Sequence, residues 1–165
     1  MNKQGVMIDI SHVSDAAFMK VLELSKAPVV ATHSSLRHFT PGWERNVSDE
    51  MLIALAENGG VIQLCFGSDF VANRKDNPDI EVSVKNVVDH IDRVRDLVGI
   101  DHVGFGSDFD GEVPLPEDIN DVSKFPNLIE ELLIRGYTES EIDKILNENI
   151  LRVWTVSYTH LTLPT

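Results

Sequence analysis

The sequence predicts an α/β fold in which short parallel strands alternate with helices. Two observations support this prediction. Four short runs are almost continuously apolar or β-branched, as in parallel strands that are covered on both faces. Helical patterns of about ten to fifteen residues lie between them, which is typical of βαβ units. The four runs are Val6 to Ser11, Val29 to Thr32, Gly60 to Phe66 and Val103 to Gly106.

The helical patterns have recognisable beginnings and ends. Ser14 and Ser48 are suited to cap the first two helices, because their hydroxyl groups can accept hydrogen bonds from the first free N–H groups. A third pattern, with valine and isoleucine on one face, ends at Gly99. The last pattern opens with a capping box formed by Thr138 and Glu141.

Chain length limits how much of a barrel these units can form. A complete (β/α)8 barrel typically needs about 250 residues, whereas this chain has 165. Four strands therefore fit either a small open α/β domain or half of a barrel. We expect the domain to occupy residues 1–154. Residues 155–165 carry four threonines and no charge, and their lack of helical period predicts a non-native or disordered tail.

Composition excludes several classes of partner. Fourteen basic and twenty-seven acidic residues give a net charge of −13, so the surface repels phosphate and we expect no nucleic-acid partner. No apolar run reaches the roughly eighteen residues that predict a membrane segment. Without a signal-peptide layout at the start, a cytoplasmic location is expected. The single cysteine, Cys65, lies in an apolar run and predicts a buried, inert thiol.

Two histidines follow neighbouring predicted strands. His12 lies in the segment ISHVS, and His33 lies in the segment ATHSS. In parallel α/β folds, ligands bind beyond the carboxyl ends of the strands, and imidazole is a common zinc ligand. The two side chains can therefore converge on one ion. The alternative is that each histidine caps a strand end by bonding to the loop backbone.

Charged residues follow other predicted strands. Asp108 and Asp110 lie in the glycine-rich segment GFGSDFDG, where a carboxylate can bind metal or take a proton, or can form an Asx-type turn. We expect Asp108 to be functional and Asp110 to belong to the turn. Asp69, in a second FGSDF segment, ranks lower because no glycine turn follows it. Arg45 can bind a substrate carboxylate, although in isolation it also fits a solvated arginine.

The remaining histidines are weaker candidates. His90 and Asp92 resemble a His-x-Asp metal pair, but residues two apart on a helix point in different directions. His102 lies at the amino end of the fourth predicted strand. In a barrel, residues at that end contribute to stability rather than to catalysis, so we expect a structural role. The sequence indicates no partner for His38.

Five segments together resemble the carboxyl-terminal half of the membrane (renal) dipeptidase family of zinc peptidases. They are GVMIDISHVSD, PVVATHSS, RNVSDEML, VGFGSDFDG and NILRVW, and the resemblance covers residues 1–154. It implies an amidohydrolase-like TIM-type barrel in which the four strands are the fifth to the eighth. It also implies an intact site with two zinc ions, in which a metal-bound hydroxide hydrolyses a dipeptide.

The resemblance also implies residue roles. His12 and His33 would be ligands of the same zinc ion, and Arg45 would bind the free carboxylate of the dipeptide. Asp108 would contact the substrate and act as catalytic acid and base. The family's His-x-Asp pair, bridging glutamate and a further histidine should lie upstream of this chain. We therefore expect a fragment of a metallo-dipeptidase, whose exposed strand edges and apolar interior favour association, a homo-oligomer included.

Two alternatives remain open at this point. In the first, the chain is a non-catalytic half-barrel fragment, because the other ligands that the family requires are expected upstream of this chain. The same barrel superfamily also contains other metal-dependent amide and ester hydrolases, and a carboxylate-binding role for Arg45 would distinguish a dipeptidase from these.

Overall fold

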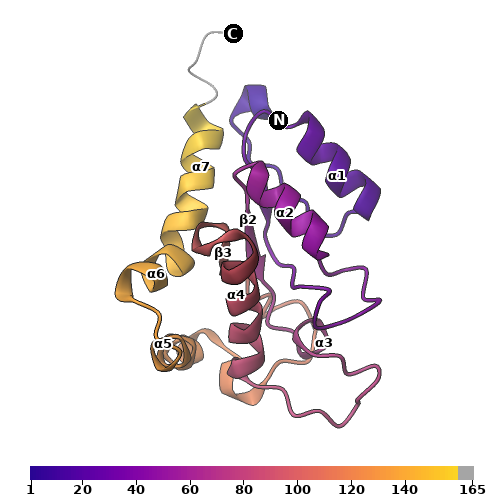
Figure 1. Ribbon diagram of the computed structural model, residues 1–165, viewed down its shortest axis with the longest axis vertical. Helices are drawn as coiled ribbons and strands as arrows, with labels where there is room; N and C mark the ends of the chain where they lie inside the picture. Colours follow the sequence, from indigo (N-terminus) through magenta and orange to yellow (C-terminus); the bar gives the residue numbers. More distant parts are fainter. Residues whose placement is uncertain (160–165) are drawn as a thin grey trace.

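The sheet consists of three parallel strands, within a computed structural model that describes residues 1–159 (Figure 1). The strands follow each other in sequence order and are β1 (Val30–Ala31), β2 (Val61–Leu64) and β3 (Val103–Phe105). Ile62, in the middle strand, pairs with Ala31 on one side and with Val103 on the other. The predicted α/β class with a parallel sheet is confirmed.

The first predicted strand forms a single parallel bridge instead. Asp9 is bridged to Val30, where Ile10 N donates to Val30 O (2.8 Å) and Val30 N donates to Ile8 O (2.9 Å). The segment thus runs beside β1 in the same direction, but the pairing is too short to count as a strand. Four predicted strands are corrected to three strands and one bridge. The physical reason is that this segment lies at the sheet edge and is paired on one side only.

Helices surround the sheet (Figure 1). The described α-helices are α1 (Asp15–Leu24), α2 (Asp49–Glu57), α3 (Ser68–Val71), α4 (Val84–Val98), α5 (Phe125–Ile134), α6 (Glu139–Asp143) and α7 (Asn149–Thr159). Short 3-10 turns occur at Asn2–Gln4, Ile100–His102, Glu117–Ile119 and Val122–Lys124, and a π-helical segment, Lys144–Glu148, joins α6 to α7.

The helix ends confirm the predicted signals. The hydroxyl groups of Ser14 and Ser48 each accept from the backbone N–H three residues on, both at 3.3 Å. Thr138 and Glu141 form a capping box at the start of α6. Gly99 follows α4 with a φ of 95°, in the left-handed region that favours glycine. These local signals fix where the helices begin and end.

The helices occupy two distinct places around the sheet. Helix α1 packs against α2, α2 against α4, and α4 against α5, which gives a continuous row. Helix α7 lies at the amino ends of β2 and β3, because Asn149 donates to the carbonyls of Ile100 and Val103 (both 2.8 Å) and Arg152 donates to that of Gly59 (2.6 Å). The carboxyl ends of the strands are therefore left to loops.

A large apolar core holds these loops in place. Phe18 from α1, Leu52 from α2, Ile62 from β2, Ile91 from α4 and Leu128 from α5 are all at most 1% exposed and belong to one cluster. Burying an apolar side chain of this size contributes about 1.5 to 3 kcal/mol to stability. The strand ends are thus anchored in a packed scaffold.

The last helix extends into the segment that the sequence predicts to be a tail. Helix α7 continues to Thr159, five residues into the predicted tail. Ser157 is only 2% exposed, and it lies one helical turn beyond the buried Val153, so this stretch packs against the protein. Residues 160–165, which include His160, lie outside the described residues. Within residues 1–159, none of the helices combines the length and the apolar character needed to cross a membrane.

Candidate metal and substrate site

Two loops bring two histidines together, one after β1 and one after the bridged residues 8–10. The Nε2 atoms of His12 and His33 are 2.8 Å apart, and the ring centroids are 4.8 Å apart. His12 has a φ of 65°, in the left-handed region that costs a non-glycine residue about 1 kcal/mol or more. The sharp turn at His12 is thus part of the geometry that pairs the rings.

Two serines that neighbour the histidines join the loops. Ser11 is 8% exposed and Ser34 is 2% exposed, and their hydroxyl oxygens lie 3.2 Å apart. The Ser11 oxygen also accepts from the backbone N–H of His33 (3.2 Å). Sequence reasoning did not assign a role to either serine. The repeated placement of serine beside histidine in both loops is the signal that could have indicated one.

A carboxylate and a hydroxyl group lie behind His33. Asp9 Oδ2 accepts from Thr32 Oγ1 (2.6 Å), and Thr32 Oγ1 lies 2.7 Å from His33 Nδ1. Asp9 Oδ1 accepts from the backbone N–H groups of Ser11 (2.9 Å) and Thr32 (3.1 Å). Burial acts to raise the pKa of Asp9, but these hydrogen bonds outweigh burial and hold the pKa below its usual value. Sequence reasoning missed both Asp9 and Thr32.

The surroundings of His12 favour its neutral form. Burial lowers the pKa of His12, and the positive charges of Arg45 and His33 lower it further, whereas Asp108 and Asp9 act in the opposite direction. Metal binding requires an unprotonated imidazole nitrogen. The electrostatic environment therefore favours the protonation state that a metal ligand needs.

Arg45 is held directly beside the histidine pair. Its Nη1 donates to Ser34 Oγ and its Nη2 donates to the carbonyl oxygen of His33, both at 2.7 Å. The guanidinium lies over the ring of Phe70, 5.6 Å from the ring centroid. Burial lowers the pKa of Arg45 from its usual value, although an arginine remains charged in proteins.

The remaining donors of Arg45 are available for an anion. Guanidinium has five N–H groups, and the two hydrogen bonds above leave three. One of these, Nε, is buried without a partner among the described residues. A half-buried, fixed guanidinium with free donors is well suited to bind a carboxylate.

Asp108 lies at the end of β3, close to the same cluster. Its backbone has a φ of 59°, and its carboxylate packs so closely on Gly111 that a Cβ atom there would lie 2.6 Å from Oδ1. Its Oδ2 is 3.8 Å from the thiol of Cys65. Its charge acts on both His12 and Arg45. The carboxylate therefore lies near enough to His12 and Arg45 to influence their pKa values.

Cys65 is buried, as the sequence predicts. Burial raises the pKa of its thiol to about 11, so the thiol is not ionised at neutral pH and is a poor nucleophile. Its contact with Asp108 was not predicted. That contact depends on the register of β2 against β3, which the sequence does not reveal.

The spacing of the histidine pair can be compared with that of zinc ligands. In a tetrahedral zinc site, two nitrogen ligands that each lie about 2.0 to 2.1 Å from the ion are about 3.3 Å apart. The Nε2 atoms of His12 and His33 are 2.8 Å apart, within about 0.5 Å of that separation. Within residues 1–159, no group of three or more His, Cys, Asp or Glu side chains is placed to hold a metal ion. The histidine pair thus fits zinc, with fewer protein ligands than the three of most catalytic sites.

His90 and His102 are engaged in the scaffold. His90 is fully buried in α4, where its Nδ1 accepts from Leu36 N (3.0 Å) and its Nε2 lies 3.2 Å from Val71 O. Asp92 binds other residues, as the sequence-based rejection of a His-x-Asp pair implies. His102 Nδ1 lies 2.8 Å from the carbonyl oxygen of Gly60. None of these side chains approaches the histidine pair.

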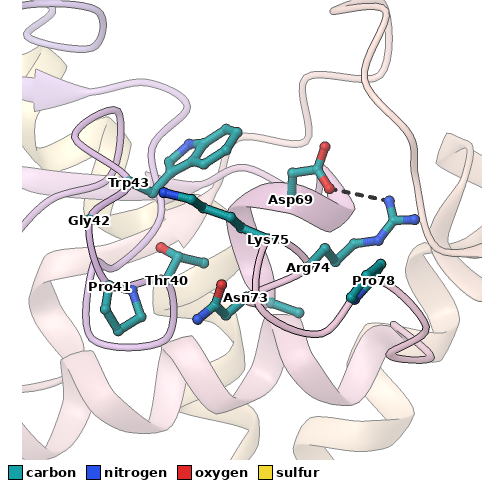
Figure 2. A pocket seen from close by; sticks show the side chains of 10 residues that line it. Thr40, Pro41, Gly42, Trp43, Asp69, Asn73, Arg74, Lys75 and Pro78 are labelled. Carbon is teal, nitrogen blue, oxygen red and sulfur yellow. Dashed lines mark hydrogen bonds and ion pairs between the residues drawn. The ribbon is translucent and has the colours of Figure 1, made fainter.

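Asp69, the sequence-based rival of Asp108, lies in a separate cavity. This cavity has a volume of about 600 Å³ and is lined by Trp43, Asp69, Arg74 and Lys75, among others (Figure 2). Asp69 forms an ion pair with Arg74 at 3.2 Å, drawn as a dashed line in Figure 2. Asp69 lies in the first turn of the short helix α3. A different cavity, of about 540 Å³, is lined by His12 and Arg45.

Comparison with known proteins identifies the family. The family model described as membrane dipeptidase, peptidase family M19, matches residues 1–160. The chain belongs to the membrane dipeptidase family. The resemblance carried by the five sequence segments is therefore confirmed, and the histidine loops, the Arg45 loop and the turn at Asp108 all lie within the matched range.

Members and structural neighbours of the membrane dipeptidase family agree with this assignment. The chain is 45% identical over 149 residues to dipeptidase ataJ of Aspergillus terreus. It superposes with a TM-score of 0.86 at 35% identity on a metallopeptidase of Rhodobacter sphaeroides that was crystallised with a phosphinate mimic of the dipeptide L-Ala-D-Ala. A probable dipeptidase of Pseudomonas aeruginosa, PvdM, gives a TM-score of 0.88 at 28% identity.

The chain is much shorter than these proteins. The alignment with ataJ covers 90% of this chain and 35% of ataJ. The superposition on the Rhodobacter sphaeroides metallopeptidase covers 94% of this chain but only 44% of that protein's chain. For PvdM the shares are 96% of this chain and 52% of the PvdM chain. The chain thus spans about a third of the curated relative and about half of the solved chains.

Proposed function

We propose that this chain carries part of the active site of a zinc-dependent dipeptidase. One observation carries the proposal: a single residue, His33, joins two kinds of binding group. Its ring faces His12 at 2.8 Å, and its carbonyl oxygen accepts from Arg45 at 2.7 Å. A possible metal ligand pair and a group that binds carboxylates are therefore side by side.

The histidine pair would hold zinc through the two Nε2 atoms. When bound, zinc would lower the pKa of a water molecule to about 7 and polarise a carbonyl group. In the intact site we infer two zinc ions, of which His12 and His33 hold one. The Rhodobacter sphaeroides metallopeptidase, which carries a dipeptide mimic, supports the inference of both a metal and a dipeptide.

Arg45 would bind the free carboxylate of the dipeptide. Its position is fixed by Ser34 and by the His33 carbonyl, so little side-chain entropy is lost when the substrate binds. One N–H group on each Nη is not used by these contacts, and a carboxylate would accept from these two groups.

Asp108 would contact the substrate and move a proton. Its carboxylate lies close enough to act electrostatically on His12 and Arg45. Peptide hydrolysis needs a group that delivers a proton to the leaving amine, and a positioned carboxyl group can do so. We assign this role to Asp108.

A non-catalytic role is the second candidate. It is favoured by one observation: residues 1–159 contain no group of three metal-binding side chains. In that case the chain would be a half-barrel fragment without turnover. Zinc content and dipeptide hydrolysis of the purified chain distinguish the two functions, because near-stoichiometric zinc with turnover excludes the second.

Replacing Arg45 by lysine tests the dipeptidase assignment. R45K keeps the charge but loses the planar fork of donors. We expect the KM, or the Kd when turnover is absent, for a dipeptide such as L-Ala-D-Ala to rise by about 10- to 100-fold, the value of one charge-assisted bidentate contact. The same dipeptide with an amidated carboxyl end should bind wild type and R45K equally weakly.

A matched control lies at the opposite end of the strands. Arg152 donates from Nη1 to the carbonyl oxygen of Gly59 (2.6 Å) and from Nη2 to that of Asp101 (2.7 Å). R152K therefore loses a comparable fork and should leave dipeptide affinity unchanged. Equal loss in both variants, or equal loss for the free and the amidated dipeptide, would reject the role of Arg45.

A further inference from the structure

We propose that Asp9 and Thr32 are positioning residues that fix the tautomer of His33, so that its Nε2 presents a lone pair toward His12. This inference rests on the proposed function, because the lone pair is what a metal ion would bind. The proposed device is a hydrogen-bond relay from the Asp9 carboxylate through the Thr32 hydroxyl to the His33 ring. We call these three residues the relay.

The first step is the direction of the hydrogen bonds at Asp9. Its two oxygens face three donors: the backbone N–H groups of Ser11 and Thr32, at 2.9 and 3.1 Å, and the Thr32 hydroxyl, at 2.6 Å. An ionised carboxylate is an acceptor only. All three contacts fit an ionised Asp9, so the hydroxyl hydrogen of Thr32 points to Asp9.

The second step is the count of protons at Thr32. A hydroxyl group has one hydrogen and two lone pairs. Because Asp9 takes the hydrogen, Thr32 Oγ1 can only accept from His33 Nδ1, which lies 2.7 Å away. His33 Nδ1 must therefore carry a hydrogen. In a neutral imidazole the other nitrogen then has none.

The third step concerns the ring nitrogen that faces His12. His33 Nε2 lies 2.8 Å from His12 Nε2, and the relay leaves it as an acceptor. His12 can supply the matching hydrogen when no ion is bound. Within the described residues, His12 Nδ1 has no hydrogen-bond partner. The tautomer of His33 is therefore preset, whereas that of His12 is free to change when an ion replaces the shared hydrogen.

Close packing keeps the relay in place. Gly106, at the end of β3, lies so near β1 that a Cβ atom there would be 2.0 Å from the Thr32 carbonyl oxygen. The backbone N–H of His33 is bound by Ser11 as well. Thr32 is thus held from both sides, which is how hydrogen-bonded partners of metal-binding histidines orient the ring in other sites.

The test compares Thr32→Val with Thr32→Ser by NMR on metal-free protein. Valine has nearly the shape of threonine but no hydroxyl, whereas serine keeps the hydroxyl. In ¹⁵N-labelled protein studied near pH 8, ring ¹⁵N shifts show which nitrogen carries the hydrogen. We expect the Nδ1–H form of His33 in wild type and T32S, and a loss of that preference in T32V and in Asp9→Asn.

A zinc titration provides the second readout. Loss of a hydrogen-bonded partner of a metal-binding histidine typically lowers metal affinity by about 10- to 100-fold. We expect this loss in T32V and D9N and wild-type affinity in T32S. His90 is an internal reference, because its Nδ1 accepts from Leu36 N and its Nε2–H form should be unchanged in every folded variant.

The outcomes separate this inference from the proposed function. A His33 tautomer in T32V identical to that of wild type, with an unchanged His90 signal, would overturn the relay even if zinc affinity fell. If wild type binds no zinc, the metal site is rejected, while the metal-free NMR comparison still decides whether the relay sets the tautomer. Should T32V lose the His90 signal, D9N and T32S carry the same comparison.

Discussion

Two histidines in this molecule are surrounded in opposite ways. His90 is fully buried in α4, and both of its ring nitrogens face backbone groups, those of Leu36 and Val71. His33 lies at the end of β1, where only Nδ1 meets the scaffold and Nε2 faces another imidazole. The comparison shows that the residue type alone does not distinguish a histidine of the scaffold from a candidate metal ligand. The distinguishing feature is a ring nitrogen that makes no hydrogen bond to the scaffold.

The largest expected effect is on stability, at the buried histidine. His90→Ala leaves the Leu36 N–H and the Val71 carbonyl without partners and creates a cavity beside Phe39, whose ring centroid is 4.4 Å from that of His90. We expect a loss of about 3 to 5 kcal/mol in the free energy of unfolding, measured by urea denaturation. The exposed His38→Ala variant should lose less than about 0.5 kcal/mol. Similar losses in the two variants would contradict this difference.

The second effect is the pH dependence of stability that His90 confers. Burial lowers the pKa of His90 to about 3, whereas the unfolded chain has the ordinary value of about 6.5. Between these values the unfolded state binds a proton that the folded state does not, so stability falls as pH falls. We expect His90 to cost about 2 kcal/mol at pH 5 relative to pH 7.

The control for this prediction is a variant that does not titrate. His90→Gln keeps an amide donor and acceptor, but it has no proton to take up in this range. The difference in free energy of unfolding between wild type and H90Q should shrink by about 2 kcal/mol between pH 7 and pH 5. A constant difference over this range would show that His90 titrates normally in the folded protein.

The smallest effect on stability is expected at the strand-end pair. His12→Gly removes an exposed side chain and relieves the left-handed backbone at φ 65°, so stability should change by no more than about 1 kcal/mol. Zinc affinity should nevertheless fall by more than about 100-fold, because a ligand contributes more than a supporting residue. Folded H90A should keep its zinc affinity. A large loss of stability in H12G, or a large loss of zinc affinity in folded H90A, would contradict this assignment.

Much of the fold could be predicted because the strands are continuous apolar runs. The segments that form β1, β2 and β3 are largely buried, so their apolar composition alone indicates that they are strands. The segment before His12 has the same composition, but Val6 is 45% exposed and only Ile8 to Ile10 pair with β1. Composition does not show whether a segment lies at an edge.

The candidate site could be predicted only in part. His12, His33 and Asp108 all follow apolar runs, and in a parallel sheet those positions meet at one end. The contacts that support them cross between strands: Asp9 reaches Thr32, and Cys65 reaches Asp108. Such contacts depend on register, which one sequence does not specify.

The turn geometry at His12 and Asp108 has a consequence for protein design. Both residues adopt left-handed backbone conformations, with φ of 65° and 59°, although neither is glycine. Grafting the two side chains onto ordinary extended strand ends would aim them in other directions. A transplanted site would have to carry its turns with it, and host scaffolds would have to be selected by backbone dihedral angles before any side chain is chosen.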